Sequence, residues 1–318
     1  MPAEMTYQQL GLSGLTVSMI GVGCNSFGAR MADEDVPAVV NTAIDAGITL
    51  FDTADVYGNA GGSEILLGRA LGSRRAEVII ATKFGSDMRG VNGPDWGARG
   101  SRRYVRIAVE SSLRRLGTDW IDLYQLHEPD PHTPIDETLA ALTEIVAEGK
   151  VRYIGSSNFA GWQVMDADWT SRTSGYEAFI SAQNEYSWLN RSVERELVPA
   201  LEHTGQSLLP FFPLGSGLLT GKYHRGEPAP TGSRLARNRA RLDQANFDLI
   251  EAIESYATER DLSILEVAIG GLSAMPTVGS VIAGATSAEQ VKHNVAAREW
   301  VPSGDDLEAL LEITKPAL

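Results

Sequence analysis

Residues 48–58 read Ile-Thr-Leu-Phe-Asp-Thr-Ala-Asp-Val-Tyr-Gly, an apolar run followed by two carboxylates, a tyrosine and a glycine. The apolar part, residues 48–51, predicts a short buried strand. Asp52 then stands at the carboxyl end of that strand, and Tyr57 lies on the loop that follows it. A phenol has an ordinary pKa of about 10, so it needs a neighbouring cation to act as an acid near neutral pH.

Two later segments repeat this arrangement. The apolar run 78–82 leads into Lys83, and the run 121–126 leads into His127. Three successive predicted strands therefore each end in an ionisable residue. Because the carboxyl ends of parallel strands meet on one face, we expect these side chains to lie close together.

Strands and helices alternate along the rest of the chain. Apolar runs predict eight strands, at 18–22, 48–52, 78–82, 121–126, 151–155, 178–182, 207–211 and 278–282. Helical periodicity follows each of them, at 33–46, 63–71, 101–116, 133–149, 160–168, 192–203, 244–260 and 287–297. Residues 5–17 predict a hairpin that lies outside this repeat.

The predicted fold is α/β: a single (β/α)8 TIM-barrel domain over residues 1–318, with an N-terminal β-hairpin and a long loop after strand seven. A doubly wound open sheet is the alternative. Its nucleotide-binding fingerprint is incomplete here, because residues 21–26, Gly-Val-Gly-Cys-Asn-Ser, lack the third glycine. Gly221-Lys222 also fails as a phosphate loop, because Ser216 replaces a glycine and Tyr223 replaces a serine or threonine of that motif.

Composition limits the kind of partner. The 318 residues are 43% hydrophobic, carry a formal net charge of -14 and include one cysteine, Cys24. An acidic chain lacks the basic face that nucleic acid binding needs. One cysteine excludes an intramolecular disulfide framework. No signal peptide or membrane-spanning run is recognisable, so we expect a soluble, cytoplasmic protein without a membrane partner.

The predicted strand ends bring together a carboxylate, a phenol, an ammonium and an imidazole, from Asp52, Tyr57, Lys83 and His127. This set suits protonation of the alkoxide that forms when hydride reaches a carbonyl carbon. The lysine would lower the pKa of the tyrosine, the aspartate would position the lysine, and the histidine would hydrogen-bond the carbonyl oxygen. Each residue alone also fits a loop cap, a solvated charge or a packing role; their joint placement favours catalysis. A metal site at His127 and His132 is disfavoured, because the intervening prolines prevent a shared helical face.

With these motifs in place, the chain resembles an aldo-keto reductase along nearly its whole length. The resemblance rests on motifs in a specific order: Gly21-Val22-Gly23, Asp52-Thr53-Ala54, Tyr57-Gly58, Thr82-Lys83, Leu126 to Asp130, Gly155 to Asn158, Ala182 to Tyr186, Pro213 to Lys222 and Gly284 to Asn294. It implies that the four strand-end residues form the family's catalytic tetrad. It also implies a small carbonyl substrate and NADPH or NADP as the cofactor, with NAD less expected.

The resemblance also implies which residues hold this cofactor. The nicotinamide carboxamide would be held by Ser157, Asn158 and Gln183, and the nicotinamide ring would stack on Phe211. The pyrophosphate would be cradled by Pro213, Leu214, Gly215, Ser216, Gly217 and Lys222. The adenosine end would be reached by Gln290 and Asn294. Further cofactor contacts are expected from Cys24, Asn25, Asp52, Phe212, Gly284 and Thr286.

Two positions depart from the family's pattern. Phe212 stands where a serine is common, and Gly270-Gly271 stands where a small residue and a tryptophan are usual. The phenylalanine is expected to alter the pocket beside the nicotinamide. The glycine pair is expected to weaken a helix away from the site, by about 1 kcal/mol per glycine relative to alanine.

Loop residues suggest the shape of the mouth and the choice of cofactor. An aromatic mouth is expected from Phe27, Trp96, Tyr186 and Trp188. Residues 213–241 contain six basic side chains against one acidic residue: Lys222, Arg225, Arg234, Arg237, Arg239 and Arg241 against Glu227. A solvated loop paired with acidic neighbours is one explanation. The other is an anionic ligand, and Arg234 resembles an arginine that grips the 2′-phosphate in related reductases, which favours NADPH over NADH.

Two other functions stay open at the level of sequence. A polyol or sugar dehydrogenase would run the same chemistry in the opposite direction. A nucleotide-sensing subunit would bind the cofactor without turnover, since potassium-channel beta subunits are similar to these enzymes. The complete tetrad favours the reductase, and the oligomeric state is left open.

Overall fold

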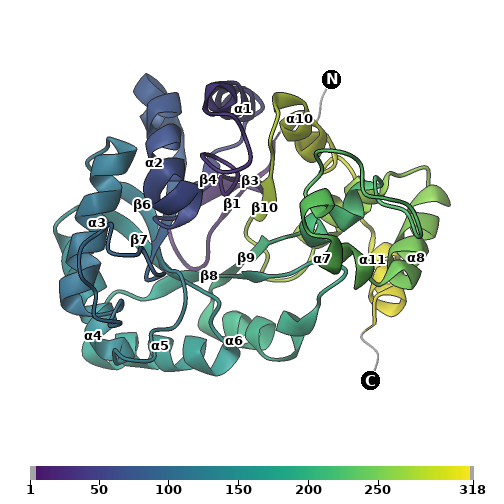
Figure 1. The fold of residues 1–318 in the computed structure, drawn as a ribbon. Coiled ribbons are helices and arrows are strands. Elements are labelled where there is room, and N and C mark those ends of the chain that lie inside the picture. The colour runs from purple at the N-terminus through teal and green to yellow at the C-terminus, as the bar shows by residue number, and fades with distance from the viewer. Residues whose placement is uncertain (1–4, 316–318) are drawn as a thin grey trace.

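The computed structural model describes residues 5–315 of the chain; residues 1–4 and 316–318 of the domain predicted for 1–318 lie outside the described residues. Eight parallel strands form a nearly closed barrel surrounded by helices, as Figure 1 shows. The predicted TIM barrel is confirmed. The strand order is β10-β3-β4-β5-β6-β7-β8-β9, so the first and last strands of the repeat are neighbours.

The barrel strands lie close to the predicted runs. Their bounds are β3 Ile20–Gly23, β4 Leu50–Asp52, β5 Ile79–Phe84, β6 Ile121–Leu126, β7 Val151–Ser157, β8 Phe179–Glu185, β9 Ser207–Phe211 and β10 Val281–Gly284. The last strand begins three residues later than predicted, because Val278 forms only an isolated parallel bridge with Leu208. That bridge links β9 to the segment before β10 and helps to close the barrel.

Helices follow the strands and form the outer ring. The α-helices are α1 Val36–Asp45, α2 Tyr57–Leu71, α3 Arg102–Leu116, α4 Ile135–Ala147, α5 Gly161–Ser174, α6 Leu197–Thr204, α7 Arg239–Asp243, α8 Phe247–Thr258, α9 Ile264–Glu266, α10 Ala288–Ala296 and α11 Gly304–Ile313. Short 3-10 helices are η1 Asp33–Asp35, η2 Gly72–Glu77, η3 Ser192–Arg195, η4 Gly215–Thr220 and η5 Leu235–Arg237, and η6 Val267–Gly271 is a π-helix. Figure 1 shows α10 beside α1, which closes the ring.

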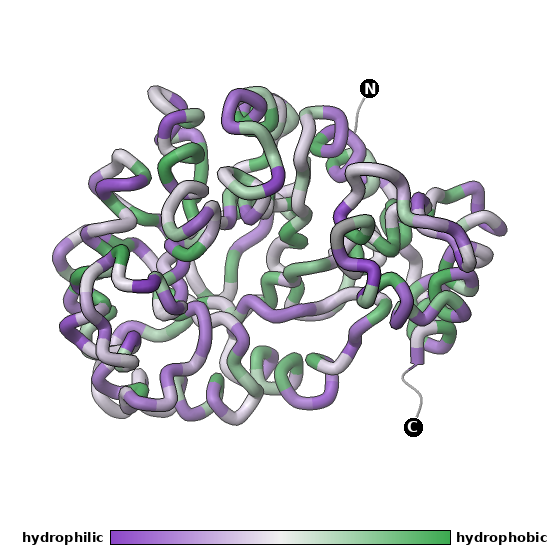
Figure 2. The backbone as a smooth tube through the Cα atoms, viewed as in Figure 1, coloured by the Kyte–Doolittle hydropathy of each residue, from purple (hydrophilic) through white to green (hydrophobic). Residues whose placement is uncertain are grey.

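Helix α3 illustrates why the sequence folds as it does. The hydroxyl of Ser101 accepts a hydrogen bond from the backbone N–H of Tyr104 and caps the start of the helix. Gly117 follows the last turn with φ +64°, a left-handed conformation that favours glycine. Figure 2 shows hydrophobic and hydrophilic residues alternating around the outer helices, as expected where one face of each helix packs on the sheet.

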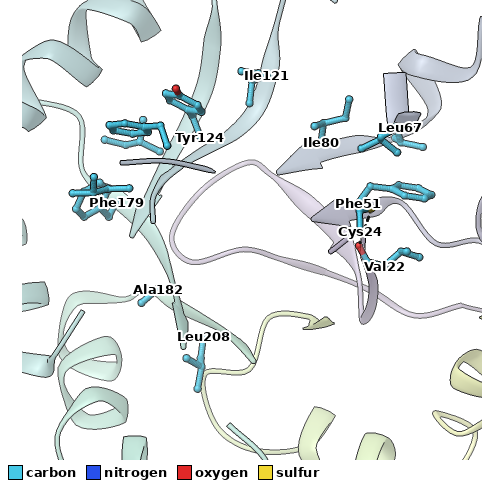
Figure 3. Packing of buried hydrophobic residues seen from close by; sticks show 14 of the residues in the cluster. Val22, Cys24, Phe51, Leu67, Ile80, Ile121, Tyr124, Phe179, Ala182 and Leu208 are labelled. Carbon is cyan, nitrogen blue, oxygen red and sulfur yellow. Dashed lines mark hydrogen bonds between the residues drawn. The ribbon is translucent and has the colours of Figure 1, made fainter. Parts of the chain in front are cut away.

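Buried side chains form one layer between the strands and the outer helices and another layer inside the barrel. Outward-facing side chains of the strands pack beneath the helices; Val22, Phe51 and Ile80 lie together with Leu67 of α2 in Figure 3. Each of these four is at most 1% exposed, and full burial of such a side chain contributes about 1.5–3 kcal/mol. The core therefore fixes the strand ends from outside the barrel.

The N-terminal hairpin, β1 Tyr7–Gln9 and β2 Thr16–Ser18, closes one end of the barrel. It confirms the predicted hairpin. Its buried residues Leu10, Leu15 and Val17 pack against inward-facing strand residues, which are Leu50, Ala81, Leu123, Leu209 and Ile282. The amino end of the barrel is thereby plugged, and a ligand must enter from the opposite end.

The glycine pair at 270–271 has a different role from the one expected. Both residues lie in the π-helix. A Cβ atom on Gly270 would lie 2.5 Å from the carbonyl oxygen of Trp300, and one on Gly271 would lie 3.0 Å from the ring of Trp188. The glycines therefore permit the close approach of the C-terminal segment and of a buried indole.

Gly270→Ala is accordingly expected to destabilise the protein by about 1–3 kcal/mol, the usual effect of overpacking. Gly62→Ala is the control, because a Cβ at that position would meet no atom within 4 Å; it should leave stability unchanged or raise it by up to about 1 kcal/mol. Urea denaturation of both variants measures the difference. A gain in stability from Gly270→Ala would show that the glycine only weakens the helix.

Within residues 5–315, no helix is long and apolar enough to cross a bilayer. The same residues contain no group of three or more histidine, cysteine, aspartate or glutamate side chains placed to hold a metal ion.

Candidate active site

A cavity of about 630 Å³ opens at the carboxyl ends of the strands, within the usual range of about 300–1,000 Å³ for a small-molecule site. Its walls come from the ends of β3, β4, β7, β8, β9 and β10 and from the segments that follow β3, β4, β6, β7, β9 and β10. Asp52, Tyr57 and His127 line it. The strand ends thus meet as the sequence predicted.

Lys83 and Asp52 form a buried ion pair at the base of this cavity. The Lys83 Nζ lies 2.8 Å from both carboxylate oxygens of Asp52 and donates to the carbonyl oxygen of Thr53 at 2.9 Å. The amide of Gln183 donates to Asp52 Oδ1 at 2.8 Å. Burial lowers the pKa of Lys83, but Asp52 and Tyr57 outweigh burial and raise that pKa above its ordinary value. The lysine is therefore charged, and its ammonium group is held by contacts with Asp52 and Thr53.

The phenol of Tyr57 lies between this cation and the imidazole of His127. Lys83 Nζ is 5.0 Å from the centroid of the phenol ring. The ring of His127 stands edge-on to the phenol, with centroids 5.7 Å apart and an interplanar angle of 83°. The other three predicted catalytic side chains, those of Asp52, Lys83 and His127, are therefore grouped around the phenol.

The pKa of Tyr57 departs from the expectation. Burial raises the pKa of the phenol, Lys83 lowers it and Asp52 raises it, and the net pKa lies above the ordinary value. The predicted lowering by Lys83 exists, but burial outweighs it. As a result Tyr57 keeps its proton at neutral pH, which is the state that a proton donor requires.

His127 is neutral at physiological pH. Burial, followed by the charge of Lys83, lowers its pKa to about 3. Its Nδ1 atom is buried and has no hydrogen-bond partner among residues 5–315. The backbone carbonyl of His127 accepts a hydrogen bond from the side-chain amide of Asn158 at 2.9 Å. A neutral imidazole beside the phenol can donate an N–H to a ligand oxygen without competing for its proton.

Most residues predicted to bind the cofactor line the same cavity as the phenol. They are Asn25, Asp52, Ser157, Asn158, Gln183, Phe211, Phe212, Pro213, Leu214, Ser216, Gly217, Lys222, Arg234, Gly284, Thr286, Gln290 and Asn294. The first and the last of them, Asn25 and Asn294, are more than 250 residues apart in the sequence. Their convergence forms one continuous wall from the phenol to the start of α10.

The residues in this wall fit a polar, extended ligand such as a dinucleotide. Ser216 and Gly217 adopt left-handed conformations, with φ +64° and +100°, inside η4. The hydroxyl of Ser216 is buried at the wall and has no hydrogen-bond partner among the described residues. A buried polar atom without a partner is unfavourable, so this groove suits a ligand that supplies one.

Two predicted cofactor residues do not line the cavity. The side chain of Cys24 lies in the hydrophobic core, with Sγ 3.6 Å from the carbonyl oxygen of Val22. Gly215 is turned away, since a Cβ there would lie 2.7 Å from Leu189. Their neighbours Asn25 and Ser216 line the cavity instead. Cys24 and Gly215 are therefore not cavity residues, and contact of these two loops with a cofactor stays a prediction.

None of the four aromatic residues predicted at the mouth lines the cavity. Phe27 is fully buried in the core beneath the helices. Tyr186 donates from its hydroxyl to Glu194 at 2.7 Å. Trp188 is buried, with Nε1 donating to the carbonyl of Val267 at 3.1 Å. Trp96 is 77% exposed and stacks against a guanidinium. The aromatic lining consists of Tyr57 and the phenylalanine pair at 211–212.

Several lining residues were missed by the sequence reasoning. Arg30, in the loop after β3, lines the cavity and donates to Asn25 Oδ1 at 2.7 Å. His293 of α10 also lines it. Gln125 of β6 does not line the cavity, but its side-chain amide donates to Asp52 Oδ1 at 3.4 Å. Only Arg30 carried a usable signal, a basic side chain in a loop that already held the predicted contact Asn25.

The basic loop divides into two groups. Arg225 pairs with Asp248 and Glu251, and Arg241 lies 3.5 Å from Glu185. These two arginines pair with acidic neighbours, as expected for a solvated basic loop. The side chain of Arg237 is not among the described ones.

Lys222 and Arg234 instead line the cavity. Arg234 makes no ion pair within residues 5–315 and stacks 4.7 Å from the ring centroid of Phe212. Burial, then the charges of Arg30 and Arg241, lower the pKa of Arg234 to about 10. Such crowding of cations favours an anionic ligand.

The chain is similar in sequence to known proteins over nearly all of its length. Residues 19–315 match the Aldo/keto reductase family. The chain is 35% identical to an uncharacterized oxidoreductase of Bacillus subtilis, with 93% of this chain and 91% of that protein covered. It is 35% identical to L-glyceraldehyde 3-phosphate reductase of Escherichia coli, with 92% and 88% covered. A probable voltage-gated potassium channel subunit beta of rice is 34% identical, with 94% and 92% covered.

Proposed function

The chain belongs to the aldo/keto reductase family, which supports NAD(P)H-dependent carbonyl reduction in general, and from this premise we propose that it reduces aldehydes or ketones with NADPH and with Tyr57 as the proton donor. The observation that carries the proposal is the phenol of Tyr57, which lies beside the Lys83–Asp52 pair and meets the imidazole of His127 edge-on. All of these groups lie at or beneath the surface of one cavity.

Each side chain has a defined task in this proposal. A nicotinamide cofactor, when bound, supplies the hydride that reduces the carbonyl carbon. Tyr57 donates its phenolic proton to the developing alkoxide, and Lys83 stabilises the resulting phenolate by its charge. His127 donates an N–H to the carbonyl oxygen and orients it. Asp52 keeps the lysine in place through two contacts of 2.8 Å.

The wall from the phenol to α10 would hold the cofactor. Asn158 and Gln183 donate hydrogen bonds to the backbone carbonyl of His127 and to Asp52, and together with the neighbouring Ser157 they suit the carboxamide. The left-handed turn at Ser216, together with Lys222, suits the pyrophosphate. Gln290 lies in the first turn of α10, where its Oε1 accepts from the backbone N–H of Thr286 at 2.9 Å. This helix start suits the adenosine end.

Assays with a panel of aldehydes, ketones and alcohols, followed by NADPH absorbance, test the proposal. We expect reduction of carbonyl compounds to be faster than oxidation of the matching alcohols at the same pH. A faster rate in the oxidative direction would identify a polyol or sugar dehydrogenase. Binding of NADPH without turnover of any compound would contradict the proposal and support a nucleotide-sensing role.

Arg234→Ala tests the choice of NADPH over NADH. The charge-assisted hydrogen bonds of a guanidinium to the 2′-phosphate contribute about 1.5–3 kcal/mol, so the variant should bind NADPH roughly 10- to 150-fold more weakly. NADH lacks this phosphate, so its affinity should change far less. Isothermal titration of both cofactors measures the two effects.

Arg239→Ala is the matched control, because Arg239 belongs to the same basic loop but lies 3.8 Å from Asp243 and is largely exposed. It should bind both cofactors as the wild type does. Equal losses of NADPH and NADH affinity in Arg234→Ala, or tighter binding of NADH by the wild type, would show that Arg234 does not read the 2′-phosphate.

A further inference from the structure

We propose that Asn92 and Arg115 are positioning residues for Tyr57, held in a buried chain of hydrogen bonds that joins the Tyr57 loop to the strand carrying Lys83. The inference rests on the proposed role of Tyr57 as proton donor. Neither Asn92 nor Arg115 lines the cavity, so any effect on the reaction must pass through other residues.

The chain begins at Asp55, two residues before the phenol. Asp55 is fully buried, and its Oδ2 accepts a hydrogen bond from the side-chain amide of Asn92 at 3.2 Å. Asn92 belongs to the loop between β5 and α3 and is 6% exposed. Its Oδ1 accepts from Arg115 Nη1 at 2.8 Å. The nitrogen and the oxygen of the Asn92 side-chain amide therefore both make hydrogen bonds inside the protein.

Arg115 carries the chain from α3 to α2 and then to β5. Its Nε donates to Glu64 Oε2 at 2.6 Å. Glu64 is fully buried, and its other oxygen accepts from the hydroxyl of Thr82 at 2.6 Å. Thr82 directly precedes Lys83. The backbone N–H of Asp55 donates to the carbonyl of Lys83 at 3.0 Å, which closes the chain into a ring.

The ring holds a backbone segment that would otherwise be unfavourable. Tyr57 is followed by four consecutive residues with positive φ, Gly58, Asn59, Ala60 and Gly61, so the beginning of α2 is a left-handed turn and not regular α-helix. Residues other than glycine rarely adopt this conformation and persist there only where the surroundings impose it. Arg115 crosses directly over Gly61, where a Cβ would lie 2.5 Å from the arginine Cδ. The guanidinium thus fixes both ends of the turn that begins at the phenol.

Correct placement of the phenol matters because proton transfer depends on hydrogen-bond reach and alignment. Loss of Asn92 or Arg115 removes the link between Asp55 and Glu64 and frees the left-handed turn. The phenol would then shift relative to Lys83 and His127, while the cofactor wall, built from other loops, would stay intact. The expected signature is a lower kcat at unchanged cofactor affinity.

The test uses Asn92→Ala and Arg115→Met in the full chain. We expect kcat to fall roughly 10- to 100-fold, while KM and the Kd for NADPH stay within about twofold of wild type. The control is Arg75→Met. Arg75 forms another buried ion pair, 2.7 Å from Asp122, and does not line the cavity. It should lower thermal stability and leave kcat unchanged. An unchanged kcat in Asn92→Ala would overturn the inference. If Arg115→Met does not fold, the kcat of Asn92→Ala is the measurement that tests the inference.

A double-mutant cycle separates positioning from general destabilisation. When Tyr57 is replaced by phenylalanine, no hydroxyl remains to be positioned, so Asn92→Ala should change kcat by less than about threefold in that background. The same fold loss in both backgrounds would overturn the inference. Wild-type turnover of Tyr57→Phe would instead overturn the proposed function, so the two failures are distinguishable.

Discussion

Replacing Tyr57 by phenylalanine is expected to lower kcat roughly a hundredfold or more, while NADPH binds as it does to the wild type. Phenylalanine keeps the ring, so the edge-on contact with His127 and the stacking against Lys83 survive. Only the hydroxyl is removed. Because that hydroxyl is the proposed proton source, the chemical step loses its acid while the cavity keeps its shape. Single-turnover rates with a reactive aldehyde measure this step directly.

Tyr256→Phe is the control for the loss of a buried phenolic hydroxyl. Tyr256 is 3% exposed and donates to Asp306 at 2.8 Å, in contact with the C-terminal helix. That variant should lose some stability and keep its turnover. If Tyr57→Phe turned over at nearly the wild-type rate, another group would have to be the proton donor.

The barrel could be predicted because its signals are local. Each strand is a short apolar run, and several helices have a periodic apolar face or a cap, as α3 has with Ser101 at its start and Gly117 after its end. Helix α11 was missed, although Ser303 and Asp306 form a capping box at its start. The glycine pair at 270–271 was misread, because its reason is contact with Trp188 and Trp300, which are distant in the sequence.

The site shows the same division between local and distant causes. The positions of Asp52, Lys83 and His127 follow from where strands end, which a sequence reveals. The expected aromatic mouth is not found, because the contacts of a loop side chain depend on residues that are distant in the sequence. Trp188, for example, points into the core and donates to the carbonyl of Val267. The pKa of Tyr57 depends on how deeply the phenol is buried. Burial is a property of the assembled barrel, so the net direction of that shift could not be read from the residues alone.

Lys83→Met should also lower kcat by roughly a hundredfold or more, because the phenolate left after proton donation would lose its nearest cation. The residual activity should have a different pH dependence. Lys83 lowers the pKa of Tyr57, whereas burial and Asp52 raise it, so removal of the lysine leaves only the raising effects. A proton donor is lost as pH rises through its pKa; hence the alkaline limb of the pH-rate profile should move to higher pH.

The variant also leaves Asp52 buried without its cation, which costs about 3–5 kcal/mol of stability. Adding Asp52→Asn removes that unpaired charge, so the double variant should recover stability and remain nearly inactive. Thermal unfolding and the pH-rate profile of both variants separate the structural effect of Lys83 from its electrostatic effect on Tyr57. An alkaline limb at the wild-type position, with a measurable rate, would mean that Lys83 holds Asp52 in place but does not tune the proton donor.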